Sequence, residues 1–264
     1  MEKALLKKLL IINGVKKIIN IFNSKNIDLR FVGGCIRDAL LNKKIKDIDF
    51  AINCHPNETV SLLKANKIHF NDYGKKYGSI TAIIDNKKIE LTSLREDINQ
   101  QGRNTEVIFT NDWRKDSSRR DFTINSIYLS VSAEFFDLFN GYKDLLNKEV
   151  KFIGNIEKRI HEDFIRILRY YRFLGCFEEF NVVKEYEKIL ESNIKNIFIH
   201  INNQVIMNEI HKMLNNTFPK NSFRDFHNPL NENNLIREIR NYWQKEKYLL
   251  GINKCINEIE KHFN

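Results

Sequence analysis

Two aspartates one residue apart are the first side chains in the sequence whose types and spacing could support chemistry. Asp47 and Asp49 alternate with apolar residues in the segment 46–52, KDIDFAI. Successive side chains of a β-strand point to opposite faces, so both carboxylates would share one face, about 7 Å apart. Carboxylates held this close repel each other, and a divalent cation between them removes the repulsion. Because hard oxygen ligands suit Mg²⁺, the pair predicts a magnesium site.

A glycine pair precedes these aspartates. Gly33 and Gly34 follow a short apolar run, and a helix-like segment begins near Cys35. Glycines let a phosphate chain approach the backbone closely, and the first turn of a helix directs free N–H groups at it. A DxD pair alone is more often a solvated strand face, and a glycine pair alone is more often a turn. Their order, strand, glycine turn, helix and second strand, favours a magnesium–nucleotide site.

A third carboxylate is expected from a predicted hairpin. The segments 79–84 and 88–92 flank the turn residues 85–87, DNK. In the second of these strands Glu90 points away from the apolar Ile89 and Leu91. It could therefore join the two aspartates.

Guanidinium and amide groups lie together in the run 119–125, RRDFTIN. The guanidinium group of an arginine can donate two hydrogen bonds to phosphate oxygens, so Arg120 is a candidate phosphate ligand. The Asn125 amide can form a hydrogen bond with a ribose hydroxyl. A surface ion pair between an arginine and Asp121 is the simpler alternative.

Four charged residues follow one another in steps of three along a helix predicted from about Ile156. This spacing places them on a polar stripe opposite an apolar one. A carboxylate that accepts from an exocyclic amine, with a guanidinium that donates to the adjacent ring nitrogen, would select cytosine and adenine over uracil and guanine. Such pairs are also common on exposed helices without any function. The four residues are Asp163, Arg166, Arg169 and Arg172, of which the first two form the candidate base-reading pair.

The remaining elements are read from periodicity and turn residues. Helical spacing predicts an amphipathic helix over 2–22 and a second helix over 55–68. The polar segment 94–120 predicts a mobile loop with short strands near 107–109. A second hairpin is expected over 127–138. From about Asn155 the periodicity is helical, with later helices over 186–190, 205–214 and 235–259.

Composition describes an ordinary soluble protein with a basic balance. The 264 residues are 42% hydrophobic and 29% charged, and the formal net charge is +9. Positive charge favours a polyanionic partner, because Lys and Arg displace counterions from phosphates. The four cysteines are widely spread without a CxxC pair, which predicts buried free thiols and no zinc site. No signal peptide or membrane span is predicted, so the cytoplasm is the expected location and a membrane partner is not.

Taken together, these runs resemble the class II tRNA nucleotidyltransferases, the CCA-adding enzymes, and the related bacterial poly(A) polymerases of the DNA polymerase beta superfamily. The resemblance extends over about residues 28–175, with the family's order and similar spacing. It rests on the runs GGCIRDALL from Gly33, DID from Asp47, ELTSLR from Glu90, RRDFTIN from Arg119, DLFNG from Asp137 and HEDFIRILRYYRF from His161.

The resemblance implies a role for each matching residue. Asp47 and Asp49 would be catalytic ligands of Mg²⁺, with Glu90 as a supporting catalytic carboxylate. The family's flexible loop would fall within 94–113. The implied nucleotide-binding residues are Gly33, Gly34, Arg37 and Arg120 at the phosphates, Asn125 near the sugar, and Asp163, Arg166, Arg169 and Arg172 at the base.

The fold class expected from this resemblance is α+β. A nucleotidyltransferase head with a mixed, mostly antiparallel sheet flanked by helices would occupy 1–150, an all-α neck 151–215 and a shortened helical body 216–264. Family members usually continue into longer body and tail domains, and the family's Glu-Arg pair is replaced here by Gln204-Val205. Monomer and dimer are both compatible with the sequence.

The implied activity is addition of CCA to the 3′ ends of tRNA from CTP and ATP. A specialist that adds only A or only CC, and a poly(A) polymerase, are the alternatives within the family. A shortened RNA-binding relative without activity is the alternative of another class, although binding alone has no use for three clustered carboxylates.

Overall fold

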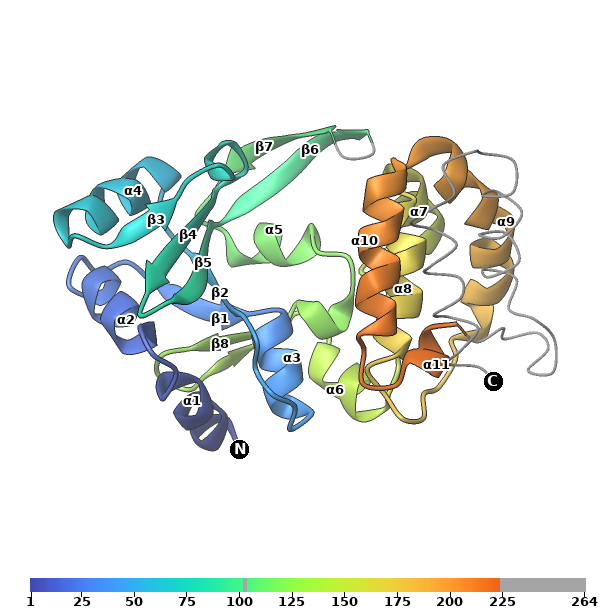
Figure 1. Ribbon diagram of the computed structural model, residues 1–264, viewed down its shortest axis with the longest axis horizontal. Coiled ribbons are helices and arrows are strands. Elements are labelled where there is room, and N and C mark those ends of the chain that lie inside the picture. The colour runs from blue at the N-terminus through green and yellow to red at the C-terminus, as the bar shows by residue number, and fades with distance from the viewer. Residues whose placement is uncertain (102–103, 224–264) are drawn as a thin grey trace. The chain divides into compact units, whose positions relative to one another are not determined.

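The computed structural model describes residues 1–101 and 104–223, and the side chains within these ranges other than those of 99–105. The chain divides into two compact units (Figure 1). The first contains residues 1–99 and 105–145, and the second contains residues 100–104 and the chain from Leu146.

A seven-stranded sheet is the framework of the first unit. Its strand order is β3-β4-β5-β2-β1-β8-β9, in which only the β2–β5 pair is parallel. This mixed, mostly antiparallel sheet confirms the predicted α+β fold class. The strands are β1 (Leu29–Val32), β2 (Ile48–Ile52), β3 (His69–Asn71), β4 (Ser79–Ile84), β5 (Lys87–Ser93), β8 (Tyr128–Ser130) and β9 (Phe135–Phe136).

Alternating burial explains why the segment around the two aspartates is a strand. Ile48, Phe50 and Ile52 of β2 are buried in the main core, and the rings of Phe31 and Phe50 lie 4.3 Å apart across the β1–β2 pair. The predicted hairpins are both confirmed, as β4–β5 and β8–β9. In the first hairpin Asp85 and Asn86 both adopt positive φ, as a tight hairpin turn requires.

Helices α1 (Glu2–Leu10) and α2 (Val15–Asn23) replace the single N-terminal helix that periodicity predicted. The prediction is wrong at Gly14, where φ is +83° and a Cβ would lie 2.8 Å from the Cβ of Ile84. A left-handed backbone angle cannot continue an α-helix, and the close contact with Ile84 leaves room only for glycine at this position. The two shorter helices instead each bury apolar residues in the main core, among them Leu9 and Phe22.

The remaining helices of the first unit are short. They are α3 (Gly34–Leu40), α4 (Pro56–Ala65), α5 (Trp113–Ser118) and α6 (Gly141–Leu146), with the 3-10 turns η1 (Lys75–Tyr77) and η2 (Thr123–Asn125). Helix α4 confirms the helix predicted over 55–68. The segment 94–120 is not an irregular loop, because it forms the two-stranded sheet of β6 (Arg95–Gln101) and β7 (Asn104–Phe109) and then α5.

The described part of the second unit is helical. Its elements are α7 (Ile156–Glu162), α8 (Ile165–Leu174), α9 (Lys184–His200), α10 (Asn203–Leu214) and α11 (Pro219–Ser222). Helices α9 and α10 confirm the helices predicted there. The continuous helix predicted from Ile156 is wrong, because Asp163 has extended backbone angles and ends α7. The helix predicted over 235–259 lies outside the described residues, as does most of the predicted body.

The predicted domain limits at 150 and 215 stay predictions. Two of the four cysteines, Cys35 and Cys176, are buried free thiols as expected, whereas Cys54 is only half-buried and Cys255 lies outside the described residues. In the part of the chain that the structure describes, no helix combines the length and apolarity needed to cross a membrane.

Candidate functional site

Asp49 lies within β2 and is half-buried, while the exposed Asp47 immediately precedes the first residue of the strand. Ile48 and Phe50 flank Asp49 in the sequence, and their buried side chains fix the position of β2. Both carboxylates line a pocket of about 310 Å³ on the polar face of the sheet.

Glu90 lies directly beside Asp49, because β5 pairs with β2 in a register that makes the two residues neighbours. The hydroxyl Oγ1 of Thr81, the next residue along this row, donates to Glu90 Oε2 at 2.8 Å. Asn71 of β3 extends the row by one more strand. A line of polar side chains therefore crosses four strands, and all four residues line the pocket.

The surroundings of Asp49 disfavour the ionised form of its carboxyl group. Burial, together with the nearby carboxylates of Glu90 and Asp47, raises the pKa of Asp49 to about 6, although the guanidinium groups of Arg120 and Arg37 act in the opposite direction. A cation between Asp47 and Asp49 would relieve this repulsion.

The residues fit a divalent cation with a partial ligand set. Within the described residues, no group of three or more His, Cys, Asp or Glu side chains is arranged to hold a metal ion. Mg²⁺ commonly binds through one or two carboxylates, with water and substrate phosphates completing its shell. Asp47 and Asp49 match this donor chemistry, and Glu90, whose Oε2 accepts from Thr81, stays a predicted supporting carboxylate.

The glycine pair brings the backbone close to Asp49. Gly33 adopts a φ of +73°, which strongly favours glycine, and precedes the first residue of α3. A Cβ on Gly34 would lie 3.9 Å from Asp49 Oδ2 and 3.7 Å from Arg37 Nη2, and a Cβ on Gly33 would lie 3.8 Å from Arg120 Nη1. The two glycines therefore bring the backbone close to one carboxylate and two guanidinium groups.

Arg37 and Asn125 come from distant parts of the sequence and meet here. Arg37 Nη1 donates to Asn125 Oδ1 at 2.7 Å, while Arg37 Nε and Nη2 donate to Asp38 Oδ1 at 3.0 and 2.8 Å. Asn125 is buried at the end of η2. The amide thus positions one of the two guanidinium groups that face the glycines.

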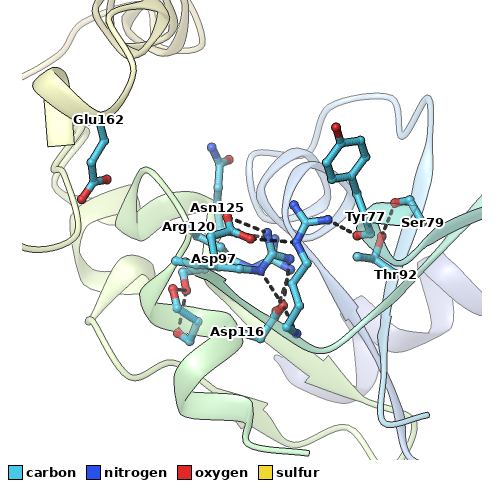
Figure 2. Close-up of polar contacts among 12 residues, drawn as sticks. Tyr77, Ser79, Thr92, Asp97, Asp116, Arg120, Asn125 and Glu162 are labelled. Atoms are coloured by element: carbon cyan, nitrogen blue, oxygen red, sulfur yellow. Dashed lines mark hydrogen bonds and ion pairs between the residues drawn. The ribbon is translucent and has the colours of Figure 1, made fainter. Parts of the chain in front are cut away.

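Asp116 positions the other guanidinium group, and sequence reasoning missed it. This fully buried aspartate of α5 accepts from Arg119 Nε at 2.8 Å, from Arg120 Nη2 at 3.1 Å and from the Tyr128 hydroxyl at 2.7 Å. Arg120 Nε donates to the same hydroxyl at 2.8 Å. Figure 2 shows Asp116 beside Arg120. The signal was present in the spacing, because Asp116 lies three and four residues before the two arginines.

These contacts control the ionisation of Asp116. Burial alone would raise the pKa of this carboxyl, but Arg119, Arg120 and the hydrogen bond from Tyr128 outweigh it and hold the pKa well below its usual range. Asp116 is therefore ionised at neutral pH, and the arginines remain fixed beside it.

The four predicted base-pocket residues belong to the second unit. Asp163 caps the end of α7, and its Oδ1 accepts from the backbone N–H of Ile165 at 3.2 Å. Arg166 is buried rather than on an exposed stripe; its Nη1 donates to Glu162 Oε2 at 2.6 Å and to the Arg159 carbonyl at 2.7 Å. Sequence reasoning passed over Glu162 as a partner of Arg166, although the two lie four residues apart.

The remaining two arginines also have partners in the second unit. Arg169 lies with its guanidinium carbon 5.8 Å from the centre of the Phe173 ring. Arg172 Nη1 lies 3.0 Å from Glu209 Oε2 of α10, a second acidic residue that the sequence reasoning did not single out. The nucleotide-pocket roles of these four residues stay predictions.

Residues 29–151 match the family model described as the poly A polymerase head domain. This range contains every element that surrounds the two aspartates. Over this range the chain is similar to the poly A polymerase head domain, and the proteins that it resembles in sequence and in structure include CCA-adding enzymes.

Curated relatives in this family have closely similar sequences. The human "CCA tRNA nucleotidyltransferase 1, mitochondrial" is 45% identical over 163 residues, which are 61% of this chain and 38% of the relative. The CCA-adding enzyme of Enterococcus faecalis is 37% identical over 158 residues, or 59% of this chain and 38% of the relative. The chain thus spans well under half of the length of these relatives.

Solved structures of the family share the fold. The structure of the Bacillus stearothermophilus CCA-adding enzyme in complex with CTP aligns with a TM-score of 0.70 and 27% identity, covering 81% of this chain and 51% of that chain. The Thermotoga maritima CCA-adding enzyme complexed with tRNA, at 23% identity and a TM-score of 0.64, supports the fold alone.

Proposed function

We propose that this protein is a magnesium-dependent, template-independent RNA nucleotidyltransferase that adds CCA to tRNA 3′ ends from CTP and ATP, with release of pyrophosphate. The observation that carries the proposal is the grouping of Asp49, Arg37 and Arg120 around the open backbone of Gly33 and Gly34. Carboxylates beside fixed guanidinium groups suit a triphosphate and its counter-cation. The CCA-adding enzymes named among the relatives support the choice of substrate class.

The chain's residues divide the work of the reaction. Arg37 and Arg120 would bind the triphosphate, and Asn125 would lie near the sugar. The reaction joins the 3′ oxygen of the RNA to the α-phosphorus and breaks the bond from that phosphorus to the pyrophosphate. Asp47 and Asp49 would hold Mg²⁺, which when bound supplies Lewis-acid polarisation of phosphoryl oxygens. Glu90 would support this carboxylate pair.

Selection of the base is assigned to the second unit. Asp163 would accept from the exocyclic amine of cytosine or adenine, and Arg166 would donate to the adjacent ring nitrogen. The ion pair with Glu162 supports this role for Arg166, because it holds the planar guanidinium group in a fixed orientation. Arg169 and Arg172 would line the same pocket.

The test is extension of three labelled tRNAs that end before CCA, after C and after CC, with CTP, ATP or both. Products resolved to single nucleotides should stop at CCA on all three and require Mg²⁺. D47N and D49N variants should lower the rate by at least about 10²–10³, because each removes a charged ligand. A single A added only to the CC-ended tRNA would indicate an A-adding specialist, and a long ladder of A would indicate a poly(A) polymerase. Binding without extension would indicate a non-catalytic relative.

The cytoplasmic location stays a prediction from the sequence. The human and mouse relatives carry the word mitochondrial in their names. Imaging of a C-terminally tagged protein in its native cell would distinguish the two compartments.

A further inference from the structure

The pocket beside Asp49 extends away from the guanidinium groups. Helix α3, which carries Arg37, contacts β1 and β2. The pocket instead continues from β2 over β5, β4 and β3, where it is lined by Glu90, Thr81 and Asn71. Asp49 therefore has the guanidinium groups of Arg37 and Arg120 on one side in the strand order. On the other side is a pocket lined by polar side chains together with Ile48 and Ile83.

A lysine lies in this second region without a partner of its own. Lys88 is exposed and lines the pocket, two residues before Glu90 and on the same face of β5. Among the described residues, no hydrogen bond or ion pair engages its ammonium group, although carboxylates line the same pocket. An unpaired cation at the edge of a carboxylate site is suited to a second anionic group.

The geometry of phosphoryl transfer indicates what that group is. The attacking oxygen and the leaving pyrophosphate lie roughly in line on opposite sides of the α-phosphorus. With the triphosphate placed at Arg37 and Arg120, the β5–β4–β3 side is the side left for the approach of the RNA 3′ end. We propose that the pocket lined by Asn71, Thr81 and Lys88 binds the terminal nucleotide of the acceptor RNA, with Lys88 contacting a backbone phosphate. This inference rests on the proposed function.

The turn that follows β3 carries side chains of the same character. Asn71 Oδ1 accepts from the backbone N–H of Tyr73 at 2.9 Å, so the pocket residue also fixes the start of the turn. The Tyr73 ring is 93% exposed, and Lys75 and Lys76 follow it in η1. Exposed aromatic and basic residues together suit single-stranded RNA, by stacking on bases and pairing with phosphates. The surface for the acceptor strand thus extends from the pocket onto this turn.

Lys88→Ala tests the assignment, and Lys87→Ala is its matched control. Both residues are exposed on β5 and both changes remove one positive charge, but Lys87 points to the opposite face of the strand and does not line the pocket. Two quantities are measured with the full-length chain: the Kd of a 5′-labelled acceptor-stem RNA ending in CC, without nucleotide, and the separate KM values for this RNA and for ATP.

K88A should raise the Kd and KM for RNA about 3–10-fold and leave the KM for ATP within about twofold, because it removes one phosphate contact. It should also lower the slope of log K against log salt by about 0.7. K87A should change neither KM by more than about twofold. Equal effects of the two variants, or an effect of K88A on ATP alone, would overturn the assignment.

The two proposals can fail separately. Normal extension with no difference between K88A and K87A would remove the acceptor subsite and leave the nucleotidyltransferase proposal intact. Selective loss of RNA binding in K88A, in a protein that extends none of the three tRNAs, would support the subsite and contradict the proposed activity.

Discussion

The carboxyl groups of Asp49 and Asp116 have pKa values that are shifted in opposite directions by their surroundings. The first shift is typical of a functional site, and the second belongs to a contact that stabilises the fold. Burial, with the nearby carboxylates of Glu90 and Asp47, raises the pKa of Asp49 to about 6. Asp116 lies among guanidinium groups, so its pKa is held well below its usual range. The first arrangement costs stability unless a cation binds, as is typical of functional sites. The second arrangement stabilises the fold and fixes Arg120 beside the glycine pair.

Replacing Asp116 with Asn should destabilise the protein by about 3–5 kcal/mol at pH 7, because the buried charges of Arg119 and Arg120 lose their partner. The pKa of Asp116 is lower in the folded than in the unfolded state, so its contribution is present above the unfolded pKa of about 4 and is lost as pH falls further. Urea unfolding of both proteins should therefore show a difference that shrinks below pH 4.

Asp38→Asn is a suitable comparison, because Asp38 also accepts from an arginine but is partly exposed. Its effect on the free energy of unfolding should be about 0–1 kcal/mol. A D116N variant as stable as D38N would show that Asp116 does not hold the two arginines.

At the scale of elements, the turn from β1 into α3 determines how closely a ligand can approach Asp49. Gly34→Ala should leave the fold intact, because the added Cβ would meet its neighbours at ordinary contact distances and alanine favours a helix by about 1 kcal/mol. The methyl group would nevertheless project into the space between Arg37 and Asp49. We expect the KM for ATP to rise about tenfold while Tm is unchanged or higher.

Gly154→Ala provides the opposite pattern. Gly154 has a φ of +81° and no atom within 4 Å of an added Cβ, so the change strains the backbone and meets no ligand space. It should lower Tm, by the equivalent of about 1 kcal/mol, and leave the KM for ATP unchanged. A G34A variant with a normal KM would exclude close approach of the triphosphate at this turn.

Elements were predictable from sequence where burial alternates with a clear period. Strand β2 follows directly from Ile48, Phe50 and Ile52, and the hairpin turn follows from Asp85 and Asn86. The prediction failed where tertiary contacts override periodicity. The chain turns at Gly14 through a positive φ, close against Ile84, and the helical spacing does not reveal this break. Strand β6 was missed, and β7 was predicted only at its end near 107–109, because the residues of these strands are mostly polar.

The candidate site shows the same division. Asp47, Asp49 and Arg120 were identified from their residue types and spacing, because these charged side chains occur in runs that suit a metal ion or a phosphate. Asp116 escaped attention because a buried supporting carboxylate resembles an ordinary surface one in sequence. The row of Asp49, Glu90, Thr81 and Asn71 depends on strand register, which only the structure provides.

At the scale of the whole molecule, the formal charge of +9 makes ionic strength a test of the partner. Binding of a protein to RNA releases about 0.7–0.9 counterions for each neutralised phosphate, so affinity falls as a power of the salt concentration. If three or more phosphates of the acceptor stem are contacted, the Kd for that RNA should rise at least about tenfold between 50 and 200 mM KCl. The KM for CTP should rise much less, because its phosphates are bound by fixed guanidinium groups at close range.

Sucrose at equal osmolality is the control, and it should leave both constants unchanged. A Kd that does not respond to salt would contradict an RNA partner, whereas a parallel rise in both constants would indicate that the salt acts on the nucleotide site.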